Sequence, residues 1–311
     1  MTRWLLKISY GLALSFCLYA GAALPPGGGV ALVLSERGPA YEELANAFAG
    51  GFGDRHGLRV LYLDGLDAKG VQALGREVGL LVPVGIKATH MVAEHAGGQA
   101  AVLALMVPRS GFEAETWPAS LPRRRLSAVY IDQPPGRSLS LIEKVLPKAK
   151  QVGVIHSHLG LANIAALSQE AARRHMSLRL AEVPPSGELA AGLRQVLPES
   201  DVLLLQPDAL VINANNVQHV LLTTYRYRIP VIGFSQGLVK AGAVAAVYSS
   251  PAQIGAQGGQ IARQWRLGEG DLPPPRYCDE YAVAFNRHVA RSLGISLPDE
   301  SMLRLHSGGE P

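Results

Sequence analysis

Three short polar segments in the stretch 201–255 could form part of a ligand site. Each follows an apolar run: Gln206-Pro207-Asp208 comes after 202–205, Ser235-Gln236-Gly237 after 229–234, and Ser249-Ser250-Pro251 after 243–248. Continuous apolar runs are typical of parallel strands that are buried on both faces. The carboxyl ends of such strands line the crevice where open α/β sheets bind ligands. The stretch therefore predicts one rim of a binding cleft, with these candidate contacts: Gln206, Asp208, Ser235, Gln236 and Tyr248.

The same position at the end of an apolar run adds Ser35 and Glu36 after 30–34, and Ser157 after 152–155. Gly85 and Lys87 follow the run 80–84, where a helix should begin. Free backbone N–H groups and the helix dipole favour an anion at a helix start. Lys87 is therefore either part of a site for a carboxylate or phosphate, or an ordinary surface lysine.

Two motifs indicate other chemistries, nucleophilic catalysis and metal binding. Gly233-Phe234-Ser235-Gln236-Gly237 matches G-x-S-x-G, the nucleophile elbow of α/β-hydrolases. Ser235 would then need a downstream acid and histidine, drawn from Asp271, Asp279, His288 and His306. His156-Ser157-His158 could place two imidazoles near a metal ion, but a metal site needs further ligands. Asp208 and His219 are available in principle, but nothing in the sequence fixes their positions. We expect a binding protein rather than an enzyme, with no metal and no cofactor.

Composition limits the partners. The net charge is +4, and without Arg3 and Lys7 the chain has 27 basic and 25 acidic residues. This balance is not a nucleic-acid signature, and the run 123–125 of three arginines is typical of a solvated loop. The sequence has no P-loop, no G-x-G-x-x-G after the first apolar run and no H-E-x-x-H. From the charge balance we expect no nucleic-acid partner.

The amino terminus has the pattern of a secretory signal peptide, although a membrane anchor is the alternative. Arg3 and Lys7 precede an apolar middle, and Ala20-Gly21-Ala22 is a small-residue cleavage pattern. The apolar part is short for a bilayer span. We predict a signal peptide at 1–22 and a tether at 23–29, hence a periplasmic protein. Phe16 before Cys17 argues against a lipoprotein, and after cleavage only Cys278 remains, so no intrachain disulfide can form.

Apolar runs and helical patterns alternate along the whole chain, with short connections. This alternation predicts an α/β protein with parallel sheets. About ten strands are too many for one small sheet, and the segment 109–125, rich in Gly, Pro and Arg, falls between two sets of strands. The sequence therefore predicts two Rossmann-like lobes joined by a hinge.

Several segments carry a family resemblance: LLLQPDALV, RIPVIGFSQGLVKAGAVAAVYSSPAQIGAQ, GEGDLPP and VARSLGISLP. They resemble the periplasmic substrate-binding proteins of ABC transporters, in the branch that includes tryptophan and tyrosine binders, from about Leu126 to Pro298. The resemblance implies the type I periplasmic-binding-protein fold. It places 30–125 plus about 243–275 in lobe 1, and 126–242 plus about 276–311 in lobe 2.

The resemblance also implies a function. It predicts a monomer that captures a small molecule, amino-acid-like or anionic, between its lobes and delivers it to an ABC permease. Asp208 stands where amino-acid binders of the family have a polar residue that can meet an ammonium group, though it could equally cap the next helix. Lys87 departs from the family, which tends to have small hydroxyl residues there. A periplasmic sensor of the same fold and a secreted hydrolase using Ser235 are the alternative functions.

Overall fold

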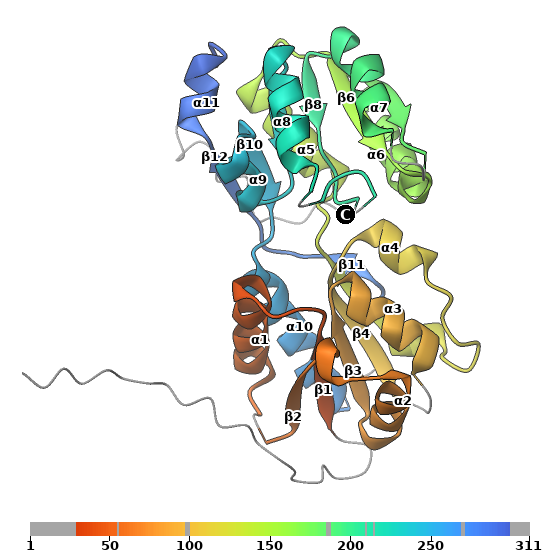
Figure 1. Ribbon diagram of the computed structural model, residues 1–311. Helices are drawn as coiled ribbons and strands as arrows, with labels where there is room; N and C mark the ends of the chain where they lie inside the picture. Colours follow the sequence, from red (N-terminus) through yellow and green to blue (C-terminus); the bar gives the residue numbers. More distant parts are fainter. Residues whose placement is uncertain are drawn as a thin grey trace, which may run out of the picture.

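The computed structural model describes residues 29–298, except 55, 97–99, 185–187, 209, 214 and 269–270. The predicted signal peptide, residues 23–28 of the predicted tether, Cys17 and His306 lie outside these residues. Within the described chain, two six-stranded sheets with flanking helices form two lobes, one above the other in Figure 1. The predicted α/β architecture of two lobes with parallel sheets is confirmed.

Lobe 1 contains a fully parallel sheet with the strand order β11-β5-β4-β3-β1-β2. Its strands are β1 (Val30–Leu34), β2 (Leu58–Tyr62), β3 (Leu80–Val84), β4 (Ala101–Val107), β5 (Leu126–Tyr130) and β11 (Arg276–Tyr277). Its helices are α1 (Pro39–Phe52), α2 (Ala68–Glu77), α3 (Ile86–His95), α4 (Arg109–Ala114) and α10 (Pro251–Arg266). The central strands β1 and β3 are buried along their whole length, which explains why they read as unbroken apolar runs.

Helices α1 and α10 lie side by side on one face of this sheet (Figure 1). Their close approach depends on glycines of α10. A Cβ atom at Gly255 would clash with the backbone carbonyl of Leu44, and one at Gly259 with that of Phe48. The helices can therefore touch along their backbones, and α10 joins the lobe 1 core although it lies far along the chain.

Lobe 2 contains the sheet β12-β10-β9-β8-β6-β7, in which only β12 runs antiparallel to its neighbour among the described strands. Its strands are β6 (Gln151–His156), β7 (Ser177–Glu182), β8 (Val202–Leu204), β9 (Val231–Gly233), β10 (Ala245–Tyr248) and β12 (Ala282–Phe285). Its helices are α5 (Pro135–Val145), α6 (Leu161–Arg173), α7 (Leu189–Val196), α8 (Val217–Arg226), α9 (Gln236–Ala241) and α11 (Arg287–Ser292).

Strand pairing places the lobe boundaries elsewhere than the predicted division did. Residues 126–130 pair with β4 and 276–277 pair with β5, so both belong to lobe 1, whereas 245–248 pair with β9 in lobe 2. The segment 109–125 is not a link between lobes. It forms α4 and a crossover that returns the chain to the next parallel strand of the same sheet.

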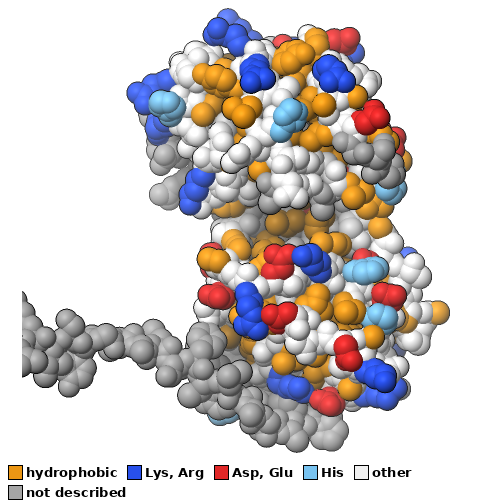
Figure 2. Space-filling view, in the orientation of Figure 1, with side chains coloured by type: hydrophobic (Ala, Val, Ile, Leu, Met, Phe, Trp, Pro, Cys, Tyr) orange, Lys and Arg blue, Asp and Glu red, His pale blue; other side chains and the backbone are white. Residues whose placement is uncertain are grey.

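The chain crosses between the lobes three times in the described residues. The first connection is 131–134, between β5 and α5; the second is 249–250, between β10 and α10; the third is 278–281, between β11 and β12. At this level the molecule narrows to a waist, where hydrophobic side chains are visible (Figure 2). None of the helices in the described residues has the length and apolar character needed to cross a membrane.

Candidate ligand-binding cleft

A pocket of about 420 Å³, counted with the open solvent at its mouth, lies between the lobes beside the connections. We call it the hinge pocket. Lobe 2 contributes the carboxyl ends of its strands, the first turn of α5 and the first two turns of α6, and lobe 1 contributes β11. The residues that line it are Asp132, Gln133, Pro135, Ser138, Asn163, Ala166, Leu205, Gln206, Pro207, Phe234, Val247 and Tyr277.

The lining combines an apolar wall with a few polar groups. Leu205, Phe234 and Val247 come from three neighbouring strands or their ends. Of the described residues that line the pocket, one is a carboxylate and none is Lys or Arg. Mostly apolar walls with a few placed polar groups are typical of small-molecule sites. The charge of this lining suits a ligand that carries a positive group.

Asp132 is the charged group of the pocket and is only 5% exposed. Its Oδ2 accepts a hydrogen bond from the backbone N–H of Arg109, at the start of α4, at 2.7 Å. Its Oδ1 accepts one from the side-chain amide of Asn163, on α6, at 3.4 Å. Burial raises the pKa of the Asp132 carboxyl to about 7, and the Arg109 N–H offsets this only in part. Asp132 therefore contacts both lobes, and the positive charge of Arg109 offsets the effect of burial only in part.

Asn163 has unused hydrogen-bonding capacity. Its Oδ1 is buried and has no hydrogen-bond partner among the described residues. Buried polar atoms are nearly always paired, so each exception needs an explanation. Because Asn163 lines the hinge pocket, a ligand N–H group would supply the missing donor.

Tyr277 forms part of the lobe 1 side of the pocket, and neighbouring groups hold it. Its hydroxyl accepts a hydrogen bond from Nη1 of Arg109 at 3.3 Å, and Arg109 Nε in turn donates to Glu113 at 2.7 Å. The Tyr277 ring meets that of Tyr130 edge-on, with ring centroids 5.8 Å apart. Burial raises the pKa of Tyr130, so its phenol stays neutral. These contacts fix an aromatic ring at the pocket wall.

Comparison with known proteins identifies the family. The family model of the ABC transporter substrate-binding proteins matches residues 131–306. The chain belongs to this family.

Relatives of this substrate-binding protein agree with that assignment. A tyrosine-binding protein of Clostridioides difficile (strain R20291) is 24% identical over 164 residues, which are 51% of this chain and 47% of the relative. The match thus spans about half the length of that curated relative.

Solved structures show the same fold. The ABC domain of a Streptococcus pneumoniae protein in complex with L-Trp is 14% identical, with a TM-score of 0.67, over 89% of this chain and 98% of that one. The ligand-free, open structure of a Clostridium difficile substrate-binding protein with adhesive properties is 19% identical, with a TM-score of 0.67, over 87% and 96%.

Among the predicted site residues, Gln206 lines the hinge pocket of the binding protein. Asp208 lies close by in sequence, but its carboxylate accepts hydrogen bonds from the loops that follow β6 and β8. Its Oδ2 accepts the backbone N–H of Ser157 at 2.8 Å and its Oδ1 accepts that of Leu210 at 3.1 Å. Ser157 is fully buried, and its Oγ accepts the N–H of Leu159. Asp208 and Ser157 thus fasten two loops of lobe 2, and neither lines the pocket.

The predicted lobe 1 residues Ser35, Glu36, Gly85 and Lys87 form what we call the α3 corner. Ser35 Oγ donates to the backbone carbonyl of Val84 at 2.7 Å. It also accepts a hydrogen bond from the backbone N–H of Ala88 at 2.9 Å, and so caps the first turn of α3. Lys87 Nζ lies 2.6 Å from Glu36 Oε1 in an exposed ion pair. The structure does not bring Lys87 to the hinge pocket.

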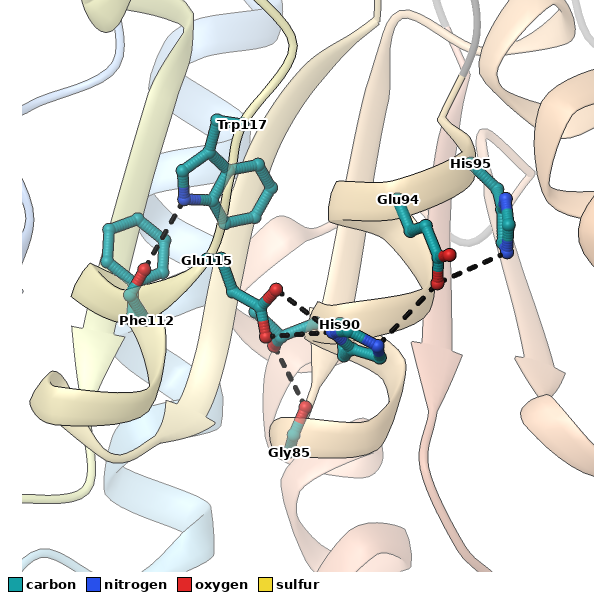
Figure 3. A network of polar contacts seen from close by, with 8 residues as sticks. Gly85, His90, Glu94, His95, Phe112, Glu115 and Trp117 are labelled. Atoms are coloured by element: carbon teal, nitrogen blue, oxygen red, sulfur yellow. Dashed lines mark hydrogen bonds and ion pairs between the residues drawn. The ribbon is translucent and has the colours of Figure 1, made fainter. Parts of the chain in front are cut away.

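Gly85 shapes this corner through its backbone. It has φ 82°, and a Cβ there would press on the hydroxyl groups of Tyr41 and Ser35. Further along α3, His90 lies between Glu94 and Glu115, with His90 Nδ1 at 3.0 Å from Glu115 (Figure 3). The Glu115 carboxylate raises the pKa of His90. This network ties α3 to the segment that follows α4.

Ser235, Gln236 and Tyr248 do not line the hinge pocket. Ser235 is the N-cap of α9, and its side chain accepts the N–H of Leu238 at 3.2 Å. Its φ of −154° is ordinary extended backbone, whereas the serine of a nucleophile elbow sits in a strained turn. The side chain of Gln236 is exposed to solvent. Tyr248 is partly buried, and this burial raises the pKa of its phenol.

The His156-Ser157-His158 segment has no metal geometry. Within the described ranges, no three His, Cys, Asp or Glu side chains are placed to hold a metal ion. His156 is buried, and its Nδ1 lies 3.0 Å from the carbonyl oxygen of Ser157.

Several pocket residues were not among the predicted contacts. Asp132 and Gln133 directly follow an apolar run, so the signal that selected Gln206 was present there too. The predicted division placed the run 126–131 at the start of lobe 2, whereas strand pairing places its strand, β5, in lobe 1. Asn163 lies inside an amphipathic helix and Tyr277 follows a run of prolines, and no local pattern distinguishes either residue.

Proposed function

We propose that this protein captures an amino acid, or a similar small molecule with an ammonium group, in the hinge pocket and delivers it to an ABC permease. Its family is that of transporter binding proteins. The relatives named above include a tyrosine-binding protein and a structure in complex with L-Trp. Since both are distant in sequence, the chemistry of the pocket has to decide the ligand class.

The observation that carries the proposal is that Asn163, whose side-chain amide donates to Asp132, has a buried Oδ1 with no hydrogen-bond partner among the described residues. An ammonium group has three N–H donors and a positive charge. It would satisfy the orphan oxygen and neutralise the buried carboxylate, which is costly to bury alone. A purely anionic ligand would meet the same carboxylate without a lysine or arginine in the lining. Of the two ligand classes expected from the sequence, the amino-acid-like one is therefore favoured.

The apolar part of the lining favours a ligand with a hydrophobic or aromatic side chain. Phe234 and Tyr277 come from different lobes. Leu205, directly after β8, and Val247, within β10, add apolar surface from lobe 2. Burying an apolar group contributes roughly 25 cal/mol per Å² removed from water. Contacts to both lobes favour the closed arrangement, and a permease would detect that closure.

The remaining expectations form part of the same proposal. The protein is exported to the periplasm through the segment 1–22, acts as a monomer and catalyses no reaction. Gln206 would contact the ligand, and its position in the pocket lining supports this role. Asp208, Ser157, Ser235 and the α3 corner serve the ligand indirectly, by holding the loops and helices around the cleft.

Thermal unfolding of residues 23–311 against a panel of amino acids, organic acids and amines tests the proposal. A ligand at 100 times its Kd should add about 2.7 kcal/mol to the free energy of unfolding. We expect hits among amino acids with apolar side chains and none among acids that lack an amine. Hits only among the organic acids would contradict the assignment of Asp132.

Two further assays separate the alternative functions. A periplasmic sensor would bind the same ligand, but deletion of the gene would leave uptake of that ligand unchanged. A hydrolase would react with a fluorophosphonate at Ser235. We expect reduced uptake in the deletion strain and no labelling of the folded protein.

A further inference from the structure

Side chains tie the three inter-lobe connections to one another. Nε2 of Gln133, in the first connection, donates to Oγ of Ser249, in the second, at 2.9 Å. The Ser249 hydroxyl donates onward to the backbone carbonyl of Glu280, in the third, at 2.7 Å. One chain of hydrogen bonds thus spans all three connections.

Arg137, in the first turn of α5, closes this chain from the lobe 2 side. Its Nη1 donates to Gln133 Oε1 at 2.8 Å and to the carbonyl of Cys278 at 2.9 Å, and its Nη2 donates to the carbonyl of Asp279 at 3.1 Å. The guanidinium also lies over the Tyr281 ring, 4.2 Å from its centroid. A planar guanidinium with several fixed donors suits such multiple carbonyl contacts, and a lysine could not reproduce them.

Arg137 also fixes the orientation of the Gln133 amide. A guanidinium can only donate, so the Gln133 oxygen must face Arg137 and the amide nitrogen must face Ser249. Gln133 is at the same time a lining residue of the hinge pocket, next to Asp132. A single side chain therefore belongs both to the pocket wall and to the link between the connections.

We propose that Arg137 is a positioning residue: with Gln133 and Ser249 it locks the three connections into one unit, so that pocket occupancy changes the angle between the lobes as a single motion. The coupling to a ligand rests on the proposed function, whereas the lock itself does not. Hinge motion concentrates backbone changes in a few residues. Tied together, the three connections must rotate jointly; untied, each can change independently.

The test measures the distance between the lobes in the absence of ligand. Fluorophores are placed on exposed helix positions of the two lobes through Lys69→Cys on α2 and Arg194→Cys on α7. The remaining cysteine of residues 23–311, Cys278, is buried and should not react. We expect one narrow distance distribution in the parent protein, and a distribution at least about twice as broad, or split, in Arg137→Met, because the connections then sample separate torsions.

Matched variants keep the result interpretable. Arg173→Met removes an exposed arginine from α6 of the same lobe and should leave the distribution unchanged. Gln133→Met should broaden the distance distribution as Arg137→Met does. Arg137→Lys should give a distribution of intermediate width. Should Arg137→Met unfold, Gln133→Met and Arg137→Lys carry the test. An unchanged distribution in the folded variants would overturn the proposal.

Titration with L-tyrosine and L-tryptophan separates this inference from the proposed function. If either binds, the parent should shift to a shorter distance in one step, and Arg137→Met should bind about 5- to 10-fold more weakly because fewer molecules are in the competent arrangement. Equal affinity in both proteins would contradict the coupling. If neither binds the parent protein, the choice of ligand is wrong, and the ligand-free distributions still decide whether the lock exists.

Discussion

The α3 corner and the hinge pocket both present polar side chains at the carboxyl ends of parallel strands, yet they differ in how much hydrogen-bonding capacity remains. At the α3 corner, Ser35 uses its hydroxyl twice and Lys87 is paired with Glu36. In the hinge pocket, Asn163 keeps an oxygen that has no hydrogen-bond partner among the described residues, and burial of Asp132 outweighs the charge of Arg109, so the pKa of Asp132 stays raised. The difference shows that a position at a strand end makes a residue a candidate. The binding site is distinguished by polar and charged groups that are still available to bind a ligand.

The largest expected effect on ligand affinity follows from removing the pocket charge. Asp132→Asn keeps the shape but loses the negative charge that an ammonium group would meet. We expect affinity for the panel hit to fall by at least about 2 kcal/mol, or ~30-fold in Kd, as is typical when one partner of a buried charge pair is lost. Calorimetric titration measures this. The folded protein should not lose stability, and an unchanged Kd would remove Asp132 from the site.

Asp208→Ala should act on stability instead of recognition. Two buried or partly buried backbone N–H groups, of Ser157 and Leu210, lose their acceptor. We expect the free energy of unfolding to fall by about 2–4 kcal/mol, measured by urea denaturation, because buried unsatisfied donors are costly. Kd should change far less than in Asp132→Asn. A larger loss of affinity with stability intact would return Asp208 to the ligand site.

The pH dependence of binding should follow Asp132. Its pKa is raised to about 7 in the free protein, so the carboxyl gains a proton as the pH falls through that value. Because only the ionised form attracts an ammonium group, affinity should weaken by about tenfold, or ~1.4 kcal/mol, between pH 8 and pH 6. Titrations in matched buffers measure this, and Asp132→Asn should abolish the slope.

The same raised pKa has the opposite consequence for the free protein. The folded state binds the Asp132 proton more tightly than the unfolded state, so this group makes the free protein less stable as pH rises from about 4 to 7. Thermal midpoints of the parent and of Asp132→Asn should therefore converge at low pH, with the variant more stable at pH 7. Parallel midpoints over this range would contradict a raised pKa.

The smallest effect is expected at the α3 corner. Lys87→Ala removes an ion pair between two exposed side chains, which contributes at most about 1 kcal/mol to stability. We expect Kd to stay within about twofold and the free energy of unfolding to change by less than about 0.5 kcal/mol. A tenfold loss of affinity would show that the ligand carries its anionic group to α3, and would reverse the comparison.

The fold could be predicted from the sequence where local patterns are strong. Buried parallel strands such as β1, β3 and β8 are continuous apolar runs, and the two-lobe division followed from their number. Strand β11 was missed because it is two residues long and follows Pro273–Pro275. Helix α4 has no strong helical pattern in the sequence, because it has only six residues and contains Gly111. The lobe boundaries depend on strand pairing, which periodicity does not encode.

Fewer residues of the candidate site than elements of the fold could be predicted from the sequence. Strand ends led to Gln206, and the same logic applies to Asp132 and Gln133. What no pattern could show is which hydrogen bonds form: that Ser35 caps α3, that Asp208 binds two loops, and that Asn163 Oδ1 has no partner among the described residues. These depend on contacts between residues distant in sequence, and they separate structural polar residues from those that can take a ligand.

The most direct test of this account is the crystal structure of the protein with the best ligand of the panel. We predict the ligand nitrogen within about 3 Å of a carboxylate oxygen of Asp132 and of Asn163 Oδ1, the usual length of such hydrogen bonds. The ligand side chain should lie against Phe234 and Tyr277. A ligand bound at the α3 corner beside Lys87, with Asn163 Oδ1 still unpartnered, would contradict the assignment of the hinge pocket as the binding site.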